Sequence, residues 1–341
     1  MTTTDITTAT TDAPTSAIPR LARHRWVRFA LRRGGRLLVS LWVLVTAAFL
    51  MIHLVPGDPV RAALGPTATP ELIEATRHRF GLDLPLWEQY LRFIAGIFTG
   101  DLGTSLEYRL PVADIIAQRL PATLALGAAG FTAAIVIAIP LGVVVAVATR
   151  RGRRRGLELG FTSTSVVLGA IPDFLIGVAL VWVFAVSLDW LPVAGANSPE
   201  SYVLPVVALA VGPAVVLARI VRVELLATLD TDFVRTARAK RLTPRRVVFR
   251  HALPSALTAS LTIGGLLLGS MIASTVLVEN VFAWPGIGQT VAGSILNKDY
   301  QLVQGIVLVY GFGALLVNTV VDVALALIDP RSGILDEGGA R

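Results

Sequence analysis

One carboxylate lies inside an apolar stretch, where it could bind a cationic group. Asp173 is the single charged residue of segment 159–188 and directly follows Pro172. An ionised carboxylate in lipid is costly unless it faces a partner, a ligand or water. Asp173 is therefore predicted either to line a transport path and contact a substrate's amino group, or to bind the backbone beside Pro172 or another subunit.

Polar residues near the ends of other apolar stretches are further candidates. Glu279 and Asn280 follow a long apolar run, where they could line a substrate entrance or face solvent at the membrane surface. Asp322 lies near the end of the last apolar run. It is expected to pair with Arg219 or Arg222, because a structural ion pair satisfies a carboxylate at that depth without a substrate.

Groups that could handle ATP or hold a metal ion are missing from the sequence. A phosphate-binding loop needs a lysine preceded by glycine, but the two lysines, Lys240 and Lys298, follow alanine and asparagine. The chain has no cysteine and its four histidines are scattered, so neither a metal site nor a cofactor is expected in it. If it takes part in ATP-driven transport, the ATPase must be another polypeptide.

The elements that position these residues are apolar runs long enough to cross a membrane. The chain is 54% hydrophobic and 16% charged, with a mean hydropathy of +0.69, whereas soluble domains carry about 25% charged residues. An all-α polytopic membrane protein with six transmembrane helices is predicted. The six runs are residues 37–55, 120–149, 159–188, 202–218, 252–278 and 301–328.

The distribution of basic residues predicts the orientation. Segments expected inside the cell carry 23 basic residues and those expected outside carry 6, which places both termini in the cytoplasm by the positive-inside rule. The same rule explains the net charge of +7 without a nucleic-acid partner. The predicted organisation is a disordered tail at 1–19, a first span with a basic lead at 20–55, an extracytoplasmic domain at 56–118, a five-helix core at 119–331 and a tail at 332–341.

The basic loop 230–254, which joins two of the spans, is predicted to form a helix–turn–helix at the cytosolic surface. Asp230 or Thr231 can cap a first helix, in which Phe233 and Ala237 lie four residues apart on one face. Thr243 can cap a second helix that begins with Pro244. Such an element at the membrane surface is suited to docking another protein.

The loop also resembles that of a known family. Its run Arg235-Thr-Ala-Arg-Ala-Lys240, followed later by Leu253-Pro254, resembles the coupling loop of permease subunits in dipeptide, oligopeptide and nickel ABC importers. In that family a glycine usually stands where this chain has Arg241, at a position expected to need a positive φ or a close backbone approach. The resemblance assigns ATPase coupling to Asp232, Phe233, Arg235, Thr236, Ala237, Arg238, Ala239, Lys240 and Arg241.

Motifs elsewhere resemble the same family and cover nearly the whole chain beyond the first tail. They include His53-Leu-Val-Pro-Gly-Asp-Pro-Val60, Gly100-Asp-Leu-Gly103 and Trp284-Pro-Gly-Ile-Gly288. The domain after the first span is similar to that of the branch's first permease. The resemblance implies the transmembrane-domain fold of type I ABC importers, with an extracytoplasmic insertion after the first helix, and a translocation path near Asp173, Glu279 and Asn280.

The function that this resemblance implies is that of a permease subunit in the prokaryotic inner membrane. It would form half of the path of an ATP-driven peptide importer, with nickel chelate, glutathione or a glycan as alternative cargo. The implied partners are a second, homologous permease, two cytosolic ATPases that bind ATP and Mg, and an extracytoplasmic binding protein. Two other classes are an ion-coupled secondary transporter and a membrane-embedded enzyme, but the sequence lacks the internal repeat of the first and the nucleophile–base pair or metal cluster of the second.

Overall fold

The computed structural model describes residues 18–54, 58–65, 68–79 and 81–328. These residues are helical almost throughout, and the β pairing among them is limited to one isolated bridge between Thr104 and Pro111. Within these described ranges, five helices are long and apolar enough to cross a membrane. They are α1 (Ile18–Leu54), α5 (Val112–Thr149), α8 (Val203–Leu229), α11 (Leu253–Val281) and α13 (Tyr300–Ile328). The predicted all-α membrane fold is confirmed.

The remaining predicted span, which is the third along the chain, is bent, and this bend was not predicted from the sequence. The run 159–188 divides into α6 (Arg155–Ala170) and α7 (Asp173–Leu180), which continues as a π-helical stretch, Val181–Ser187, and the two halves meet at 96°. Pro172 causes the break, because proline has no backbone N–H and keeps the preceding residue out of the helical region. Ile171 accordingly has extended backbone angles, φ −78° and ψ 124°.

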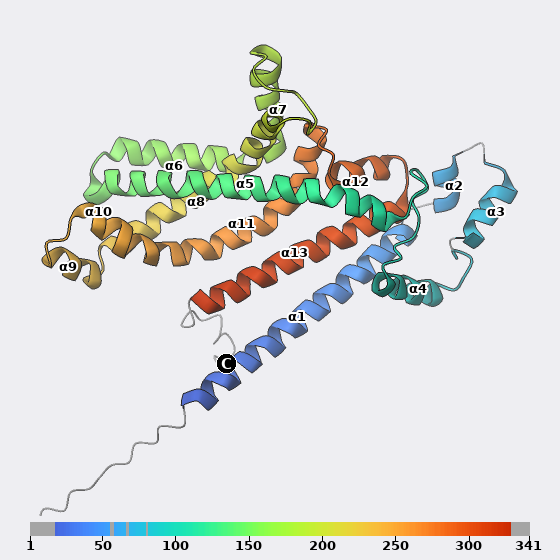
Figure 1. Cartoon of the computed structure of the whole chain (residues 1–341), viewed down its shortest axis with the longest axis horizontal. Coiled ribbons are helices and arrows are strands. Elements are labelled where there is room, and N and C mark those ends of the chain that lie inside the picture. Colours follow the sequence, from blue (N-terminus) through green and yellow to red (C-terminus); the bar gives the residue numbers. More distant parts are fainter. Residues whose placement is uncertain (1–17, 55–57, 66–67, 80, 329–341) are drawn as a thin grey trace, which may run out of the picture.

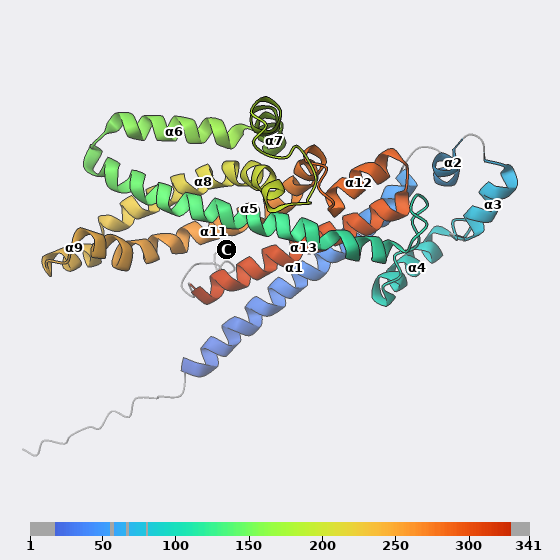
Figure 2. The same ribbon diagram turned by 45° about the horizontal axis from the view of Figure 1, so that its top comes forward.

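Helices α5, α8 and α11 form the centre of the bundle and run side by side, with α1 and α13 packed against one another next to them (Figures 1 and 2). Close approach at the centre depends on small residues. A Cβ atom on Gly142 of α5 would lie 2.7 Å from the carbonyl oxygen of Ala218 in α8. Lipid cannot drive helices together by the hydrophobic effect, so such close packing is a main source of their association.

A small-residue face on α11 is used inside the chain. Added Cβ atoms on Gly265 and Gly269 would collide with Val321 and Asn318 of α13. The two glycines therefore allow α11 and α13 of one chain to pack closely.

An ion pair joins α1 and α13, and its basic partner differs from the one predicted from the sequence. Asp322 of α13 pairs with Arg33 of α1, whereas the sequence analysis expected Arg219 or Arg222. The correct partner is nearly 300 residues away in the sequence, on a helix whose neighbours the local pattern does not reveal.

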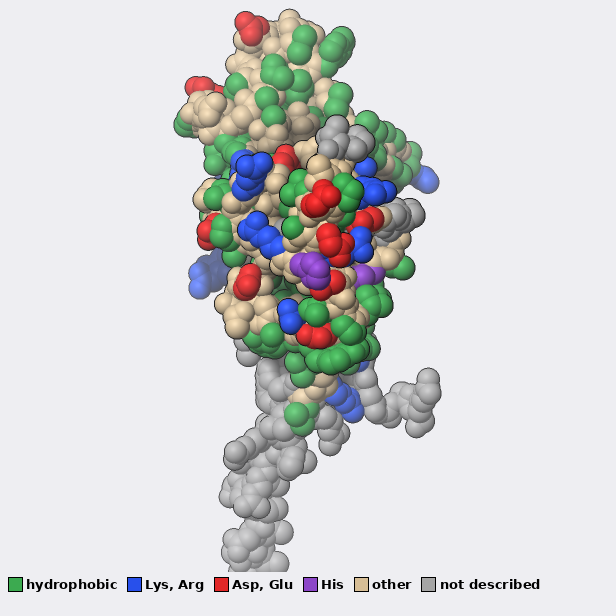
Figure 3. Space-filling view, turned by 90° about the vertical axis from the view of Figure 1, so that its right-hand side faces the viewer, with side chains coloured by type: hydrophobic (Ala, Val, Ile, Leu, Met, Phe, Trp, Pro, Cys, Tyr) green, Lys and Arg blue, Asp and Glu red, His purple; other side chains and the backbone are tan. Residues whose placement is uncertain are grey.

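Three short helices lie at one end of the molecule. They are α2 (Pro59–Leu64), α3 (Pro70–Arg79) and α4 (Leu86–Thr99). Phe49 of α1 contacts the ring of Tyr90, with centroids 5.1 Å apart, while Trp87 and Phe98 are exposed. Figure 3 views this end and shows acidic and basic side chains interspersed over it. We call these helices and the segment 100–111 that follows them the α2–α4 domain.

Candidate functional site

The basic loop forms the predicted helix–turn–helix at the end of the molecule opposite the α2–α4 domain (Figure 1). Its first helix, α9 (Asp232–Ala239), begins after Thr231, and its second, α10 (Pro244–Arg246), begins after Thr243. Pro244 occupies the first helical position, where its missing N–H is no loss. A π-helical stretch, Val247–Ala252, then leads directly into α11.

The inner face of α9 is bound to the rest of the chain. Val234 and Ala237 are buried in a cluster with Leu229 of α8 and with Val247 and Ala252. Phe233 is 48% exposed on another side of the helix. The prediction that Phe233 and Ala237 share an outward face is therefore wrong. Residues 234 and 237 form the inward pair, since the spacing i, i+3 also places two side chains on one face.

Arg238 fastens α9 to the end of α8. Its guanidinium Nη2 donates to the carbonyl oxygen of Leu229 at 2.8 Å, and this carbonyl belongs to the last turn of α8, where no helical donor remains. Burial lowers the pKa of Arg238, and the positive charges of Arg150 and Arg151 lower it further. Arg238 thus binds within the chain, while the exposed surface of α9 and its following turn is formed by Asp232, Phe233, Arg235, Thr236, Ala239, Lys240 and Arg241.

Arg241 has the left-handed backbone conformation that the family's glycine predicts. Its φ is +56°, and its N–H donates to the carbonyl oxygen of Arg238 at 2.9 Å. A left-handed conformation costs a residue with a Cβ about 1 kcal/mol. The turn between α9 and α10 therefore keeps its geometry although the glycine is absent.

A buried cation connects α8 to two neighbouring helices just below the loop. Arg222 of α8 is 8% exposed, its Nη2 lies 2.6 Å from Glu158 Oε1 of α6, and its Nε donates to Thr149 Oγ1 of α5 at 3.3 Å. This pairing was not predicted from the sequence. The available signal was that Glu158 is the one acid near the predicted inner end of its span.

Asp173 lies at the N-terminus of α7, directly after the 96° bend. Its carboxylate reaches α8, where a Cβ on Gly212 would lie 3.0 Å from Asp173 Oδ1. The side chain is half-buried and also lies beside Ser274 of α11. The bend thus brings Asp173 to the central helices, in a position compatible with both roles predicted for it.

Glu279 and Asn280 organise the turn after α11. Glu279 is fully buried, and its Oε2 accepts from the backbone N–H groups of Gly288 at 2.7 Å and Gln289 at 3.1 Å, at the start of α12 (Ile287–Leu296). Gly288 has no room for a side chain, because a Cβ would lie 2.8 Å from Glu279 Oε2. Asn280 is exposed and donates to the carbonyl oxygen of Val276 at 2.7 Å. A substrate could contact Glu279 only if α12 moved.

Comparisons with known proteins agree over most of the chain. The family model "Binding-protein-dependent transport system inner membrane component" matches residues 138–333, and its companion model for the N-terminal part of such membrane components matches residues 26–127. The glutathione transport system permease protein GsiC of Escherichia coli (strain K12) is 36% identical over 305 residues, covering 89% of this chain and 98% of that protein. GsiC of Salmonella paratyphi A is 37% identical over the same share.

A solved structure shows a similar fold. In an inward-facing structure of the MetNI methionine ABC transporter, one chain superimposes on this one with a TM-score of 0.52 at 19% identity, covering 63% of this chain and 96% of that one.

The left-handed turn at Arg241 leads to a stability prediction. Replacing Arg241 with glycine should raise the free energy of unfolding slightly, by up to about 1 kcal/mol, because glycine adopts a positive φ without strain. Arg245→Gly is the matched control and should destabilise by about 1 kcal/mol, because it puts glycine into the helical segment α10. Thermal unfolding of the detergent-purified proteins measures both. A larger loss for Arg241→Gly than for Arg245→Gly would contradict the strain interpretation.

Proposed function

The chain belongs to the family of binding-protein-dependent transport system inner membrane components, and from this premise we propose that it is a permease subunit that couples ATP hydrolysis to import of peptides. One observation carries the proposal. Helix α9 exposes Phe233 among charged residues while its inner face is buried in the chain's own core. An aromatic residue surrounded by charges is a typical anchor for a partner protein.

The contacts of α9 supply a route by which a partner's movement would reach the spans. Arg238 and the buried pair Val234 and Ala237 make α9 move with α8. The contacts of Arg222 with Glu158 and Thr149 extend this coupling to α6 and α5. Displacement of α9 by a cytosolic ATPase would therefore move the central helices together and open the path alternately to each side.

Asp173 is the best-placed residue of this chain for the path. Helix α8, which is fastened to α9, also carries Gly212 against the Asp173 carboxylate, so movement of α8 would change the surroundings of this charge. Asn280 and the buried Glu279 would belong to the outer gate, with α12 as the part that moves.

The remaining subunits are also part of the proposal. A second homologous permease would complete the path as a heterodimer, two ATPases would bind ATP and Mg, and a binding protein would deliver the cargo. This chain has no ATPase site of its own in the proposal. Both termini and α9 would lie in the cytoplasm, with the α2–α4 domain outside.

Peptide cargo is proposed from the family branch and from its relatives. The GsiC permeases are named for glutathione, which is itself a tripeptide, so glutathione is the first alternative, ahead of nickel chelate or a glycan. An ion-coupled secondary transporter is the competing class. Uptake into proteoliposomes that contain the whole complex distinguishes the two classes. With ATP as the only energy source and no ion gradient, only the importer should accumulate substrate.

The docking role of α9 predicts the effect of one mutation. Phe233→Ala should weaken binding of the ATPases by about thirtyfold, since loss of an aromatic anchor costs about 2 kcal/mol. Substrate-stimulated ATP hydrolysis should fall with it. Co-purification and hydrolysis rates measure these effects, and Phe98→Ala, at an exposed phenylalanine of the opposite end, is the matched control. Ala237→Glu is not a clean test, because it would place a charge in the chain's own core. Wild-type co-purification and stimulation with Phe233→Ala would refute the coupling role.

The path role of Asp173 predicts a substrate-dependent phenotype. Asp173→Asn keeps the size and hydrogen bonding of the side chain but removes its charge, so uptake should change by about tenfold for peptides with a free amino group and less for acetylated ones. The assembled complex should keep its thermal stability. If stability falls while the ratio of the two uptake rates is unchanged, Asp173 has a structural role only.

The proposed orientation can be tested with single cysteines, since the chain has none. A cysteine at Thr99, an exposed position on α4, should react with a membrane-impermeant maleimide in intact spheroplasts, and one at Lys240 only after lysis. Ser105, although it lies in the same domain, is unsuitable because it is 1% exposed. The reverse labelling pattern would overturn the orientation.

A further inference from the structure

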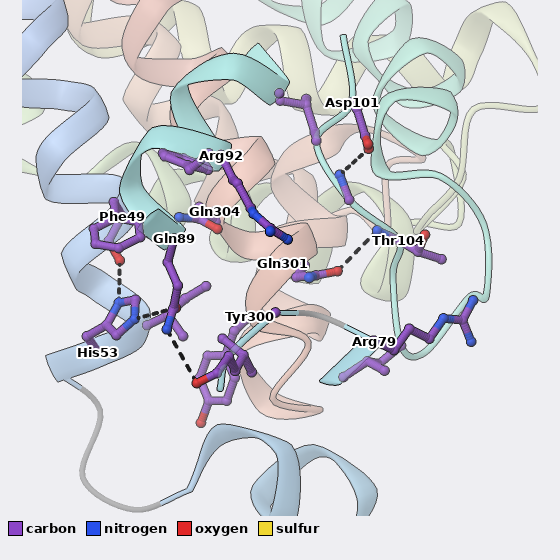
Figure 4. Close-up of a pocket in the computed structure, with 18 of the residues that line it drawn as sticks. Phe49, His53, Arg79, Gln89, Arg92, Asp101, Thr104, Tyr300, Gln301 and Gln304 are labelled. Atoms are coloured by element: carbon purple, nitrogen blue, oxygen red, sulfur yellow. Dashed lines mark hydrogen bonds between the residues drawn. The ribbon is translucent and has the colours of Figure 1, made fainter. Parts of the chain in front are cut away.

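A pocket of about 370 Å³ lies where the α2–α4 domain meets the ends of α1 and α13 (Figure 4). Its lining comes from five parts of the chain, namely the end of α1, Val60 of α2, the α3–α4 region, the segment 101–106 and the start of α13. This volume is within the range of small-molecule sites, which run from about 300 to 1,000 Å³. No role in coupling or in the central path accounts for it.

One wall of the pocket is fixed by a hydrogen-bonded pair. His53 of α1 lies with its Nε2 3.1 Å from Gln89 Oε1 of α4, and its Nδ1 is 3.1 Å from the carbonyl oxygen of Phe49. The amide nitrogen of Gln89 donates to the carbonyl oxygen of Leu84 at 2.8 Å. These bonds hold α1, α4 and the turn before α4 together without a ligand.

The opposite wall is fixed in the same way. Gln301 Oε1, at the start of α13, accepts from the N–H of Thr104 at 3.1 Å, and Asp101 Oδ1 accepts from the N–H of Gly103 at 3.0 Å. Gly103 has a φ of +86°, and a Cβ there would lie 2.9 Å from Gln301 Oε1. Next to it, Asp299 accepts from Ser105 Oγ and from the N–H of Glu107 at 3.1 Å. A preformed site loses less entropy when it binds a ligand.

The charges in the pocket favour an anionic ligand. Two basic residues line it, Arg79 at the end of α3 and Arg92 in α4, against one acidic residue, Asp101. Figure 4 shows Arg92 reaching from α4 toward Gln301. One side of its guanidinium is engaged, with Nη2 2.9 Å from Glu88 Oε1. The Oε1 of Gln301 is bonded to Thr104, so its amide nitrogen is the end suited to a ligand oxygen.

We propose that this pocket binds the free carboxylate of a short peptide on the outer side of the membrane. Arg92 holds the carboxylate as a charge-assisted donor, the amide nitrogen of Gln301 donates a second bond, and Asp101 accepts from an N–H group of the peptide. The peptide class and the outer location rest on the proposed function, but the binding itself requires no ATP. The pocket would hold cargo before it enters the central path.

A binding measurement on the whole complex tests the proposal. The purified complex in nanodiscs, without ATP or binding protein, is titrated calorimetrically with trialanine and with trialanine amide. Wild type should bind trialanine about tenfold more tightly than the amide. Arg92→Gln should weaken trialanine binding about tenfold and abolish that difference, while Arg92→Lys should keep part of it. Arg61→Gln, at an exposed arginine of α2 outside the pocket, is the matched control and should leave both affinities unchanged.

Three results would overturn the proposal. They are no measurable trialanine binding by the wild-type complex at millimolar peptide, equal binding of the acid and the amide, or unchanged binding with Arg92→Gln. Weaker docking of the binding protein with Arg92→Gln, at unchanged trialanine affinity, would identify a protein-docking surface instead. A negative result for carboxylate binding in the pocket is distinguishable from failure of the proposed function, because ATP-driven uptake and its dependence on Phe233 are measured separately.

Discussion

Lipid offers no hydrogen-bond partners, so each break in a membrane helix must be covered by protein. In the described part of this chain one span is broken, before α7, and a turn after α11 leads into the short helix α12; an acidic residue accompanies each of these two places. Asp173 stands in the first turn of α7, and Glu279 accepts from the first amides of α12. Negative charge is favoured at a helix N-terminus. The two acids proposed for the path thus also stabilise the irregular backbone at these two places.

Helix α8 connects α9 with the bend that carries Asp173. It contacts α9 through Leu229, binds α5 and α6 through Arg222, and meets Asp173 at Gly212. Its small residues, such as Ala218 against Gly142, place it close to α5. A helix held this tightly at several depths responds to force as a rigid body, because packed interiors are poorly compressible.

The sequence was sufficient for features set by local chemistry. Apolar length predicted the spans, Thr243 and Pro244 predicted the start of α10, and the family's glycine predicted the left-handed turn at Arg241. Features set by long-range contacts were missed. Ala237 was predicted on the docking face of α9 with Phe233, but it lies on the buried face with Val234. The position of α8 decides which face of α9 is buried. The partners of Arg222 and Asp322, and the burial of Ser105, likewise depend on helices distant in sequence.

The bond between Ser105 and Asp299 has a consequence for the order of biosynthesis. These residues are 194 positions apart, and Asp299 immediately precedes the last span. A chain made from its N-terminus exposes the α2–α4 domain long before Asp299 has left the ribosome. The part of the domain that binds Asp299 can therefore be completed only after four further spans have been inserted. The surface of the α2–α4 domain is then completed only when the chain is nearly complete, so a chain truncated before Asp299 would lack a finished surface for a partner to bind.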